Sequence, residues 1–80
     1  MKLETTVEKL IRQITGIEVI DKKTNVFDKP YLMRARDLAY MCVQIDQKFH
    51  INWDVFLSNL QEYTIEEIVK LLYMSLVFDL

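Results

Sequence analysis

The sequence predicts an all-α fold, a bundle of four helices with a long connection between the first and the second. Apolar residues recur at the i, i+3, i+4 spacing of a helix face through most of the chain. Half of the residues are hydrophobic, and the chain has a single Gly and a single Pro, a composition that suits a packed helical domain. Eighty residues are enough for one small core, so we expect residues 1–80 to form a single domain.

The first predicted helix covers about residues 6–15. Thr5 and Glu8 are spaced as a capping box, which is typical of a helix start. Gly16 is placed to end the helix in the left-handed conformation that glycine adopts readily. The apolar face that we expect to be buried comprises Val7, Leu10, Ile11 and Ile14.

The connection that follows, about residues 17–33, combines turn formers with apolar residues. The turn formers and helix breakers are Asp21, Asn25, Asp28 and Pro30. The apolar residues are Val19, Ile20, Val26, Phe27, Tyr31 and Leu32. This is too much apolar material for a free linker, and structureless loops of this length are uncommon in compact domains. We therefore expect the connection to pack over the core.

Three further helices are predicted. The second covers about residues 34–49, with an apolar stripe formed by Leu38, Met41, Cys42, Ile45 and Phe49. Asn52 is expected to cap a short third helix that ends near residue 60. Its inward residues should be Trp53, Phe56, Leu57 and Leu60. Thr64 and Glu67 form a second capping box, which opens a fourth helix. Its buried residues should be Ile65, Ile68, Val69 and Leu72.

The last ten residues, 71–80, are apolar on nearly all sides, although a helix in a domain this small buries only one side. We therefore expect part of this segment to be exposed, namely some of Tyr73, Met74, Val77, Phe78 and Leu80. A contiguous exposed patch there would be a contact surface, including one for a homo-oligomer. The alternative is that the segment folds back over the connection at residues 17–33.

Composition and charge disfavour several classes of protein. The net charge of −2 gives no basis for binding nucleic acid or a membrane surface, and no apolar run approaches the roughly 18 residues of a membrane span. The first residues lack the apolar core of a signal peptide. Cys42 is the only cysteine, so no internal disulfide can form. We therefore expect a cytoplasmic protein.

No catalytic or metal-binding set of residues is evident. His50 is the only histidine, which leaves no histidine-based metal site or catalytic triad to argue for. Cys42 lies on the predicted buried stripe, where cysteine usually acts as a small hydrophobic residue. Ser58 lies in the short third helix, and the pair Glu66 and Glu67 is explained by the capping box. We expect a protein that is not an enzyme and that binds no metal.

Four segments, in order along the chain, resemble the acyl carrier protein family: residues 7–17, 25–28, 45–51 and 60–68. The first is similar to the family's first helix, which ends in Gly followed by a hydrophobic residue. The third looks like the end of its second helix, with a Phe-x-Ile signature at Phe49 to Ile51. The resemblance spans most of the chain. It implies an acyl-carrier-like four-helix bundle, with three main helices and a short third one.

The family's function rests on a serine at the start of the second helix, to which 4′-phosphopantetheine is attached. Counting back from Phe49 and forward from Phe27 both place that serine at Ala35. Alanine has no hydroxyl that could form the phosphodiester, and no Ser or Thr lies between Thr24 and Ser58. The resemblance therefore implies a degenerate attachment position, and neither 4′-phosphopantetheine nor another cofactor is expected.

The same region suggests a surface that binds a protein partner. Partners of the family usually contact acidic residues along the second helix, whereas this chain has Arg34 and Arg36 at its start. Each cation opposes the helix dipole at a cost of a few tenths to about 1 kcal/mol. Such a pair suits contact with an acidic partner or a phosphate, and equally a tolerated solvated pair. Ala39, Tyr40 and Val43 would add an apolar strip on the same helix.

Two functions remain open from the sequence. The first is a non-enzymatic interaction module that keeps the carrier fold and docks on a biosynthetic enzyme, in particular a peptide-modifying enzyme of a peptide-maturation system. The alternative is a functional acyl or peptidyl carrier that attaches its cargo at another residue or binds an acyl chain non-covalently between its helices.

Overall fold

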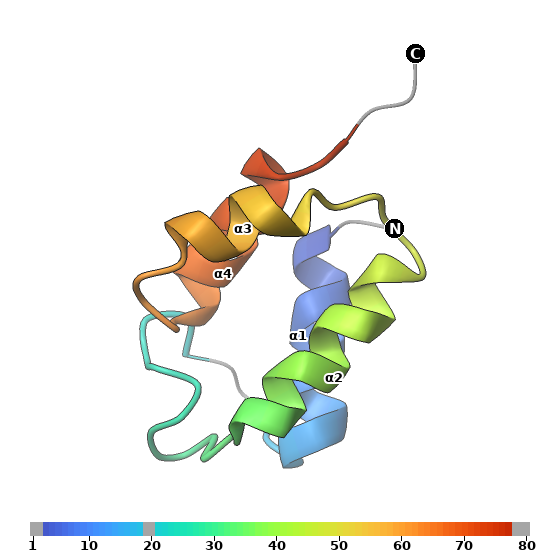
Figure 1. Cartoon of the computed structure of the whole chain (residues 1–80). Helices are drawn as coiled ribbons and strands as arrows, with labels where there is room; N and C mark the ends of the chain where they lie inside the picture. The colour runs from blue at the N-terminus through green and yellow to red at the C-terminus, as the bar shows by residue number, and fades with distance from the viewer. Residues whose placement is uncertain (1–2, 19–20, 78–80) are drawn as a thin grey trace.

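In a computed structural model, which describes residues 3–18 and 21–77, this chain forms four helices and no strand within those residues (Figure 1). The helices are α1 (Leu3–Thr15), α2 (Ala35–Asp46), α3 (Trp53–Asn59) and α4 (Ile65–Met74). The prediction of an all-α bundle, with a long connection before the second helix and a short third helix, is confirmed. None of the described helices is both long enough and apolar enough to cross a membrane.

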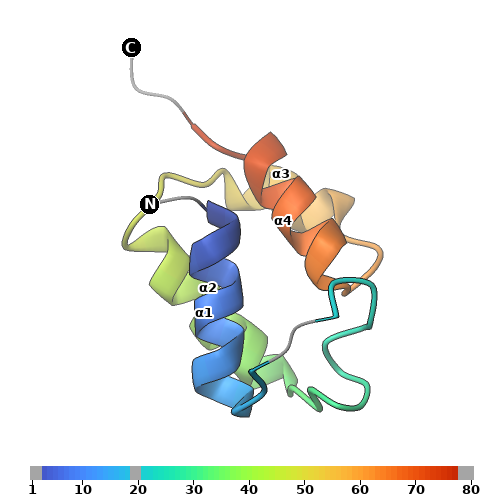
Figure 2. The ribbon, with the colours of Figure 1, turned by 180° about the vertical axis from the view of Figure 1, so that it is seen from behind.

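The helices form two layers around one core. Helices α2 and α3 lie on the near side in Figure 1, and α1 and α4 lie on the near side in Figure 2. Helix α1 packs against α2 and α4, and α3 packs against α4. The centre of the core is filled by large, fully buried side chains from all four helices, including Ile11, Met41, Phe56, Ile68 and Leu72. Most of the apolar stripes predicted from helical spacing therefore face inward.

Local signals place three of the helix ends. Asn52 caps α3 by accepting a hydrogen bond from the Val55 N–H (3.2 Å). Thr64 caps α4 in the same way by accepting from the Glu67 N–H (3.1 Å). Gly16 follows α1 with a φ of +75°, and its N–H donates to the carbonyl of Arg12 (2.8 Å). These three predictions are confirmed.

The predicted capping box at Thr5 is wrong, because α1 begins two residues earlier, at Leu3. Leu3 is almost fully buried in the core. Burying a leucine side chain contributes about 1.5–3 kcal/mol, whereas a cap contributes about 1 kcal/mol. The extra turn of helix that carries Leu3 into the core is thus the more stable arrangement, and Thr5 lies inside the helix.

Helix α2 is shorter than predicted at both ends. It begins at Ala35, with Arg34 as its cap residue in an extended conformation (φ −107°, ψ 164°). It ends at Asp46, and the N–H groups of Lys48 and Phe49 then both donate to the carbonyl of Ile45 in a closing turn. Phe49 packs against the core from this turn. The prediction that Phe49 faces the core is therefore confirmed, whereas the prediction that it lies in the helix is wrong.

The connection between α1 and α2 packs over the core along its described part. Val26, Tyr31 and Met33 are buried. The N–H of Val26 donates to the carbonyl of Tyr63, and the N–H of Met33 donates back to the carbonyl of Val26 (both 2.9 Å). The expectation that this connection covers the core is confirmed for residues 21–33. The apolar residues Val19 and Ile20 lie outside the described residues.

Polar contacts also hold this connection in place. Lys22 forms ion pairs with Glu4 and Glu8 of α1, and both the hydrogen bond and the charge of Glu4 raise the pKa of the lysine. Asp21 accepts hydrogen bonds from the Lys23 N–H and the Thr24 hydroxyl, which lower the pKa of its carboxyl group. The loop is therefore fixed by its polar residues as well as by its apolar ones.

The segment after α4 pairs with the connection between α2 and α3. The N–H of Asn52 donates to the carbonyl of Ser75 (2.7 Å), and the N–H of Val77 donates to the carbonyl of His50 (2.8 Å). An antiparallel bridge joins Ile51 to Leu76. In the described part of the segment, residues 75–77 therefore lie along the connection before α3 and not over the long first connection, as the alternative for residues 71–80 expected.

The predicted exposure of this apolar segment is confirmed where the structure describes it. Tyr73, Met74 and Val77 are exposed. Phe78 and Leu80 lie outside the described residues.

Candidate functional site

Helix α2 starts where the resemblance places the attachment serine. The side chain of its cap residue, Arg34, offers no hydrogen-bond acceptor to the N–H groups of the first turn. Ala35 is exposed at the first position of the helix. The N–H of Arg34 donates to Oδ2 of Asp37 (2.9 Å), which stabilises the first turn from one side only. The carbonyl of Arg34 accepts from the N–H of Asp37 (2.9 Å), but an arginine side chain has no acceptor atom, so it cannot accept from another N–H of this turn.

The predicted partner-binding residues are all exposed, and four of them share one side of α2. Arg36, Ala39, Tyr40 and Val43 stand at i, i+3, i+4 and i+7, so their side chains are neighbours along the helix. More than half of the surface of Tyr40 (52%) and Val43 (56%) is exposed. Arg34 precedes the helix at a position that does not share this spacing. The structure thus groups four of the five residues and separates Arg34 from them.

An apolar groove runs between α2 and α3 beside these residues. Its volume is about 410 Å³. The lining residues are Ala39, Cys42, Val43 and Asp46 from α2, and Trp53 and Leu57 from α3. A second hollow of about 270 Å³ shares Ala39, Cys42 and Leu57 and continues the groove over Leu38, Phe56 and Leu60. Apart from Asp46, these side chains offer carbon and sulfur surface, so the groove suits an apolar occupant.

Aromatic residues border the groove at both ends. Nε1 of Trp53 donates to Oδ1 of Asp46 (2.8 Å), which joins the start of α3 to the end of α2. At the other end the rings of Phe27 and Tyr63 lie 5.0 Å apart. Within the described residues α2 and α3 do not pack directly against each other, since α3 packs against α4 whereas α2 packs against α1.

Because α2 does not cover this side of α3, the prediction for Leu57 is wrong. Leu57 was expected to face the core, but 61% of its surface is exposed, and it lines the groove. Helical spacing within α3 identifies an apolar side, but it does not tell whether another helix covers that side. The small residues Ala35 and Ala39, facing Leu57 from α2, were the available signal for a groove here.

Cys42 also lies in the groove wall and is half-buried rather than central to the core. Burial raises the pKa of its thiol. A raised pKa lowers the fraction of the reactive thiolate at neutral pH. The position therefore favours a packing role, as the sequence predicts, and not nucleophilic chemistry.

Leu32 is a surface feature that sequence analysis missed. Its φ is +49°, in the left-handed region, and 58% of its surface is exposed just before α2. A leucine in this conformation costs about 1–2 kcal/mol. Its turn-forming neighbours indicated a bend, but nothing in the sequence marks this residue as the one with positive φ.

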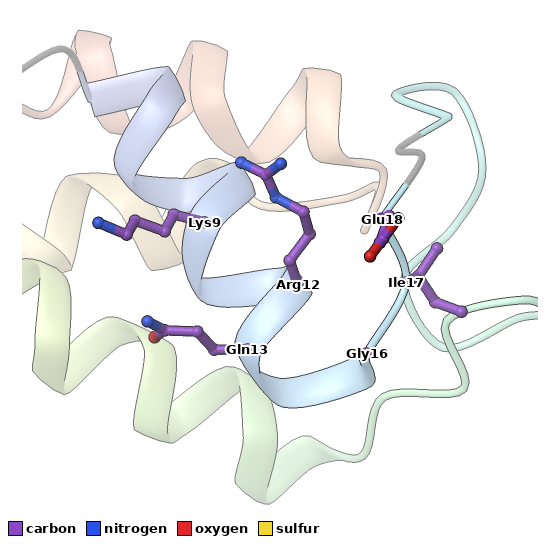
Figure 3. A pocket seen from close by; sticks show the side chains of 6 residues that line it. All are labelled: Lys9, Arg12, Gln13, Gly16, Ile17 and Glu18. Carbon is purple, nitrogen blue, oxygen red and sulfur yellow. The ribbon is translucent and has the colours of Figure 1, made fainter.

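A wide hollow of about 930 Å³ lies at the end of α1, lined by Lys9, Arg12, Gln13, Gly16, Ile17 and Glu18. Figure 3 shows that the ends of the Lys9, Arg12 and Glu18 side chains point in different directions. Such an arrangement does not converge on one bound group. Among the described residues, no group of three or more His, Cys, Asp or Glu side chains is placed to hold a metal ion.

Comparison of the chain with protein-family models, with curated proteins and with solved structures finds no match. The candidate site is therefore defined by its own residues: the exposed strip on α2 and the apolar groove beside it.

Proposed function

We propose that this chain is a non-catalytic protein-interaction module, related to acyl carrier proteins, that docks on a biosynthetic enzyme through the exposed strip of α2. The observation that carries this proposal is the grouping of Arg36, Ala39, Tyr40 and Val43 on one solvent-facing side of the helix. Exposed apolar residues beside a cation are the composition of a protein interface, with an apolar centre and a charged rim.

The arrangement of elements supports the relationship to carrier proteins. The order of a long helix, a long ordered connection, a second long helix, a short third helix and a final helix agrees with the carrier-like bundle that the resemblance implies. Ala35 stands at the first position of α2, where the family carries its serine. The residues at this position do not fit 4′-phosphopantetheine, because the methyl group of alanine offers no oxygen for a phosphodiester.

Docking would use the two properties of the strip in different ways. Tyr40 and Val43 would lose exposed apolar surface to the partner, which stabilises the complex by about 25 cal/mol per Å² of that surface before the costs of association. Arg36 would pair with a carboxylate of the partner and fix the orientation of the complex. A peptide-modifying enzyme with an acidic, partly apolar surface is the partner class that we propose, in a cytoplasmic setting.

A second candidate function has one observation in its favour. The groove between α2 and α3 is nearly all apolar, and at about 410 Å³ its size falls in the range of small-ligand sites. A fatty acyl chain bound there without a covalent bond would make the chain a lipid-binding carrier. Titration with a medium-chain fatty acid, followed by the fluorescence of Trp53 in the groove wall, distinguishes this function, because only a ligand in the groove changes that signal saturably.

The experiment that tests the loss of the arm is intact-mass measurement after incubation with coenzyme A and a broad-specificity phosphopantetheinyl transferase. A carrier protein with its serine serves as the positive control. We expect the control to gain one phosphopantetheine and this chain to keep its mass. A mass shift in this chain would overturn the proposal, and mapping the modified residue would then identify a carrier that uses another position.

A further inference from the structure

Four exposed residues of α2 form a self-complementary face. Arg36, Ala39, Val43 and Asp46 are spaced by three, four and three residues, which places them along one side of the helix. All four are exposed. In order they present a cation, a small residue, a larger apolar residue and a carboxylate. We call this set the α2 face.

The α2 face is complementary, in charge and in side-chain size, to a second α2 face that runs in the opposite direction. When two copies of α2 are placed antiparallel about their midpoint, Arg36 lies opposite Asp46 of the second copy, and Ala39 lies opposite Val43. Two-fold symmetry repeats each pair, so both charges of each face are neutralised. We propose that the α2 face binds the α2 face of a second copy of this chain, in an antiparallel pair.

Within one copy, both charged residues of the α2 face remain able to bind a second copy. Nε1 of Trp53 holds the Asp46 carboxylate through Oδ1 (2.8 Å), and a carboxylate so oriented accepts further hydrogen bonds. At the other end, Arg36 forms no ion pair within the described residues. A guanidinium without an internal partner gains most from a carboxylate on another molecule.

The apolar middle of the face is shaped for a second helix. The methyl side chain of Ala39 leaves room for a close approach, and Val43 of the second copy can occupy it. Leu57, exposed for 61% of its surface on the other wall of the groove, extends the apolar contact beyond α2. The pair thereby covers the groove that is open in the single chain.

The size of the face sets the strength of the association. A helix of 12 residues is about 18 Å long, so the contact lies at the low end of specific interfaces. The dimer is therefore weak, and its two ion pairs make it weaker at high salt. This association does not require the proposed function. If both hold, self-association competes with docking, because the two use Arg36, Ala39 and Val43.

The test is sedimentation equilibrium of the full chain over a concentration series from about 10 μM to 1 mM at low and at high salt. Three variants are compared with the wild type: Arg36→Glu, Asp46→Lys, and Lys9→Glu as a matched control with the same charge change on an exposed position of α1. We expect the wild type and the Lys9→Glu variant to associate equally. Each of the other two variants should associate about tenfold or more weakly, because it faces itself with like charges.

The decisive measurement is an equimolar mixture of the Arg36→Glu and Asp46→Lys variants. Both ion pairs are restored only when the two variants pair with each other. The glutamate of Arg36→Glu then faces the lysine of Asp46→Lys, and the unchanged Asp46 of the first variant faces the unchanged Arg36 of the second. We therefore expect the mixture to associate at least as strongly as the wild type. Because Asp46→Lys removes the acceptor of Trp53, its helicity is checked first, and Asp46→Asn, which keeps an acceptor oxygen, provides the second variant; it should associate more weakly than the wild type.

Three outcomes would overturn the proposal. A wild type that stays monomeric up to 1 mM at low salt excludes the pair at any relevant strength. A mixture that associates no better than its two components excludes the antiparallel register. An equal loss for Lys9→Glu and Arg36→Glu assigns the association to net charge and not to the α2 face. None of these outcomes decides whether the chain docks on an enzyme, which a partner-binding experiment tests separately.

Discussion

Replacing Arg34 by serine should stabilise the fold, because the cap position of α2 now carries a side chain that cannot cap. Arg34 already has the extended backbone of a cap residue (φ −107°, ψ 164°), so a serine needs no rearrangement. Its hydroxyl oxygen would accept a hydrogen bond from the N–H of Arg36, because the N–H of Asp37 already donates to the carbonyl of Arg34 (2.9 Å). The bond from the Arg34 N–H to Asp37 uses the backbone of residue 34 and is retained.

Two contributions add up in the Arg34→Ser variant. A new cap contributes about 1 kcal/mol to the free energy of unfolding. Removing a cation from a helix N-terminus contributes a further few tenths to about 1 kcal/mol. The sum, about 1–2 kcal/mol, corresponds to a rise in Tm of roughly 4–8 °C per kcal/mol for a domain of this size.

The assay is urea unfolding followed by far-UV circular dichroism and by the fluorescence of Trp53. Lys9→Ser, on the exposed side of α1, is the matched control, since it makes a similar exchange of cation for serine inside a helix. We expect the control to lose up to about 0.5 kcal/mol through lower helix propensity. A free energy of unfolding for Arg34→Ser at or below that of the wild type would refute the reasoning. A gain would show that Arg34 is not required for folding.

Three further predictions concern the surroundings of the site. Leu32→Gly should raise the free energy of unfolding by a few tenths to about 1 kcal/mol, because it relieves a left-handed leucine whose side chain is exposed; a loss in urea unfolding would mean that Leu32 packs. Trp53→Phe should lower that free energy by about 1 kcal/mol, since it removes the 2.8 Å hydrogen bond to Asp46, and the loss should shrink in an Asp46→Ala background. Cys42 should react with a thiol reagent at pH 8 more slowly than it does in the urea-unfolded chain, because burial raises the pKa of its thiol, and reaction at equal rates would exclude that burial. The same shift sets the sign of the pH effect. Because the folded chain keeps the Cys42 thiol protonated to a higher pH than the unfolded chain does, the free energy of unfolding falls as the pH rises from the ordinary thiol pKa through the raised pKa of the folded chain.

Features fixed by neighbouring residues could be predicted from the sequence. Asn52 and Thr64 cap helices because their side chains reach an N–H three residues along the chain. Gly16 ends α1 because its own backbone tolerates a positive φ. The buried stripes of α1 and α4 follow from spacing in the same way. Each of these features depends on a few adjacent residues.

Features that depend on distant residues could not be predicted. Thr5 is a suitable cap, but the helix passes it because Leu3 finds a place in the core that only the folded chain provides. Leu57 has the spacing of an inward residue, yet it faces the groove because α2 and α3 pack against different helices. Ser75 and Val77 bond to the connection before α3, a pairing that neither segment signals alone.

The candidate site shows the same division. The exposure of Arg36, Tyr40 and Val43 follows from the helical spacing of α2, which the sequence specifies. The groove beside them, and the place of Cys42 in its wall, depend on α2 and α3 packing against different helices, which helical spacing does not predict. The left-handed Leu32 follows from neither, because leucine rarely adopts that conformation.

The most direct test of the proposed docking is an NMR titration of the ¹⁵N-labelled chain with candidate peptide-modifying enzymes. Chain concentration is kept at about 50 μM at physiological salt, near the low end of the sedimentation series, to limit self-association. We predict that one enzyme perturbs the amides of residues 36–43, and that Arg36→Glu, but not Lys9→Glu, weakens the complex by about tenfold or more. Perturbations confined to Tyr73, Met74 and Val77, or equal affinities for the two variants, would contradict the account and move the interface away from α2.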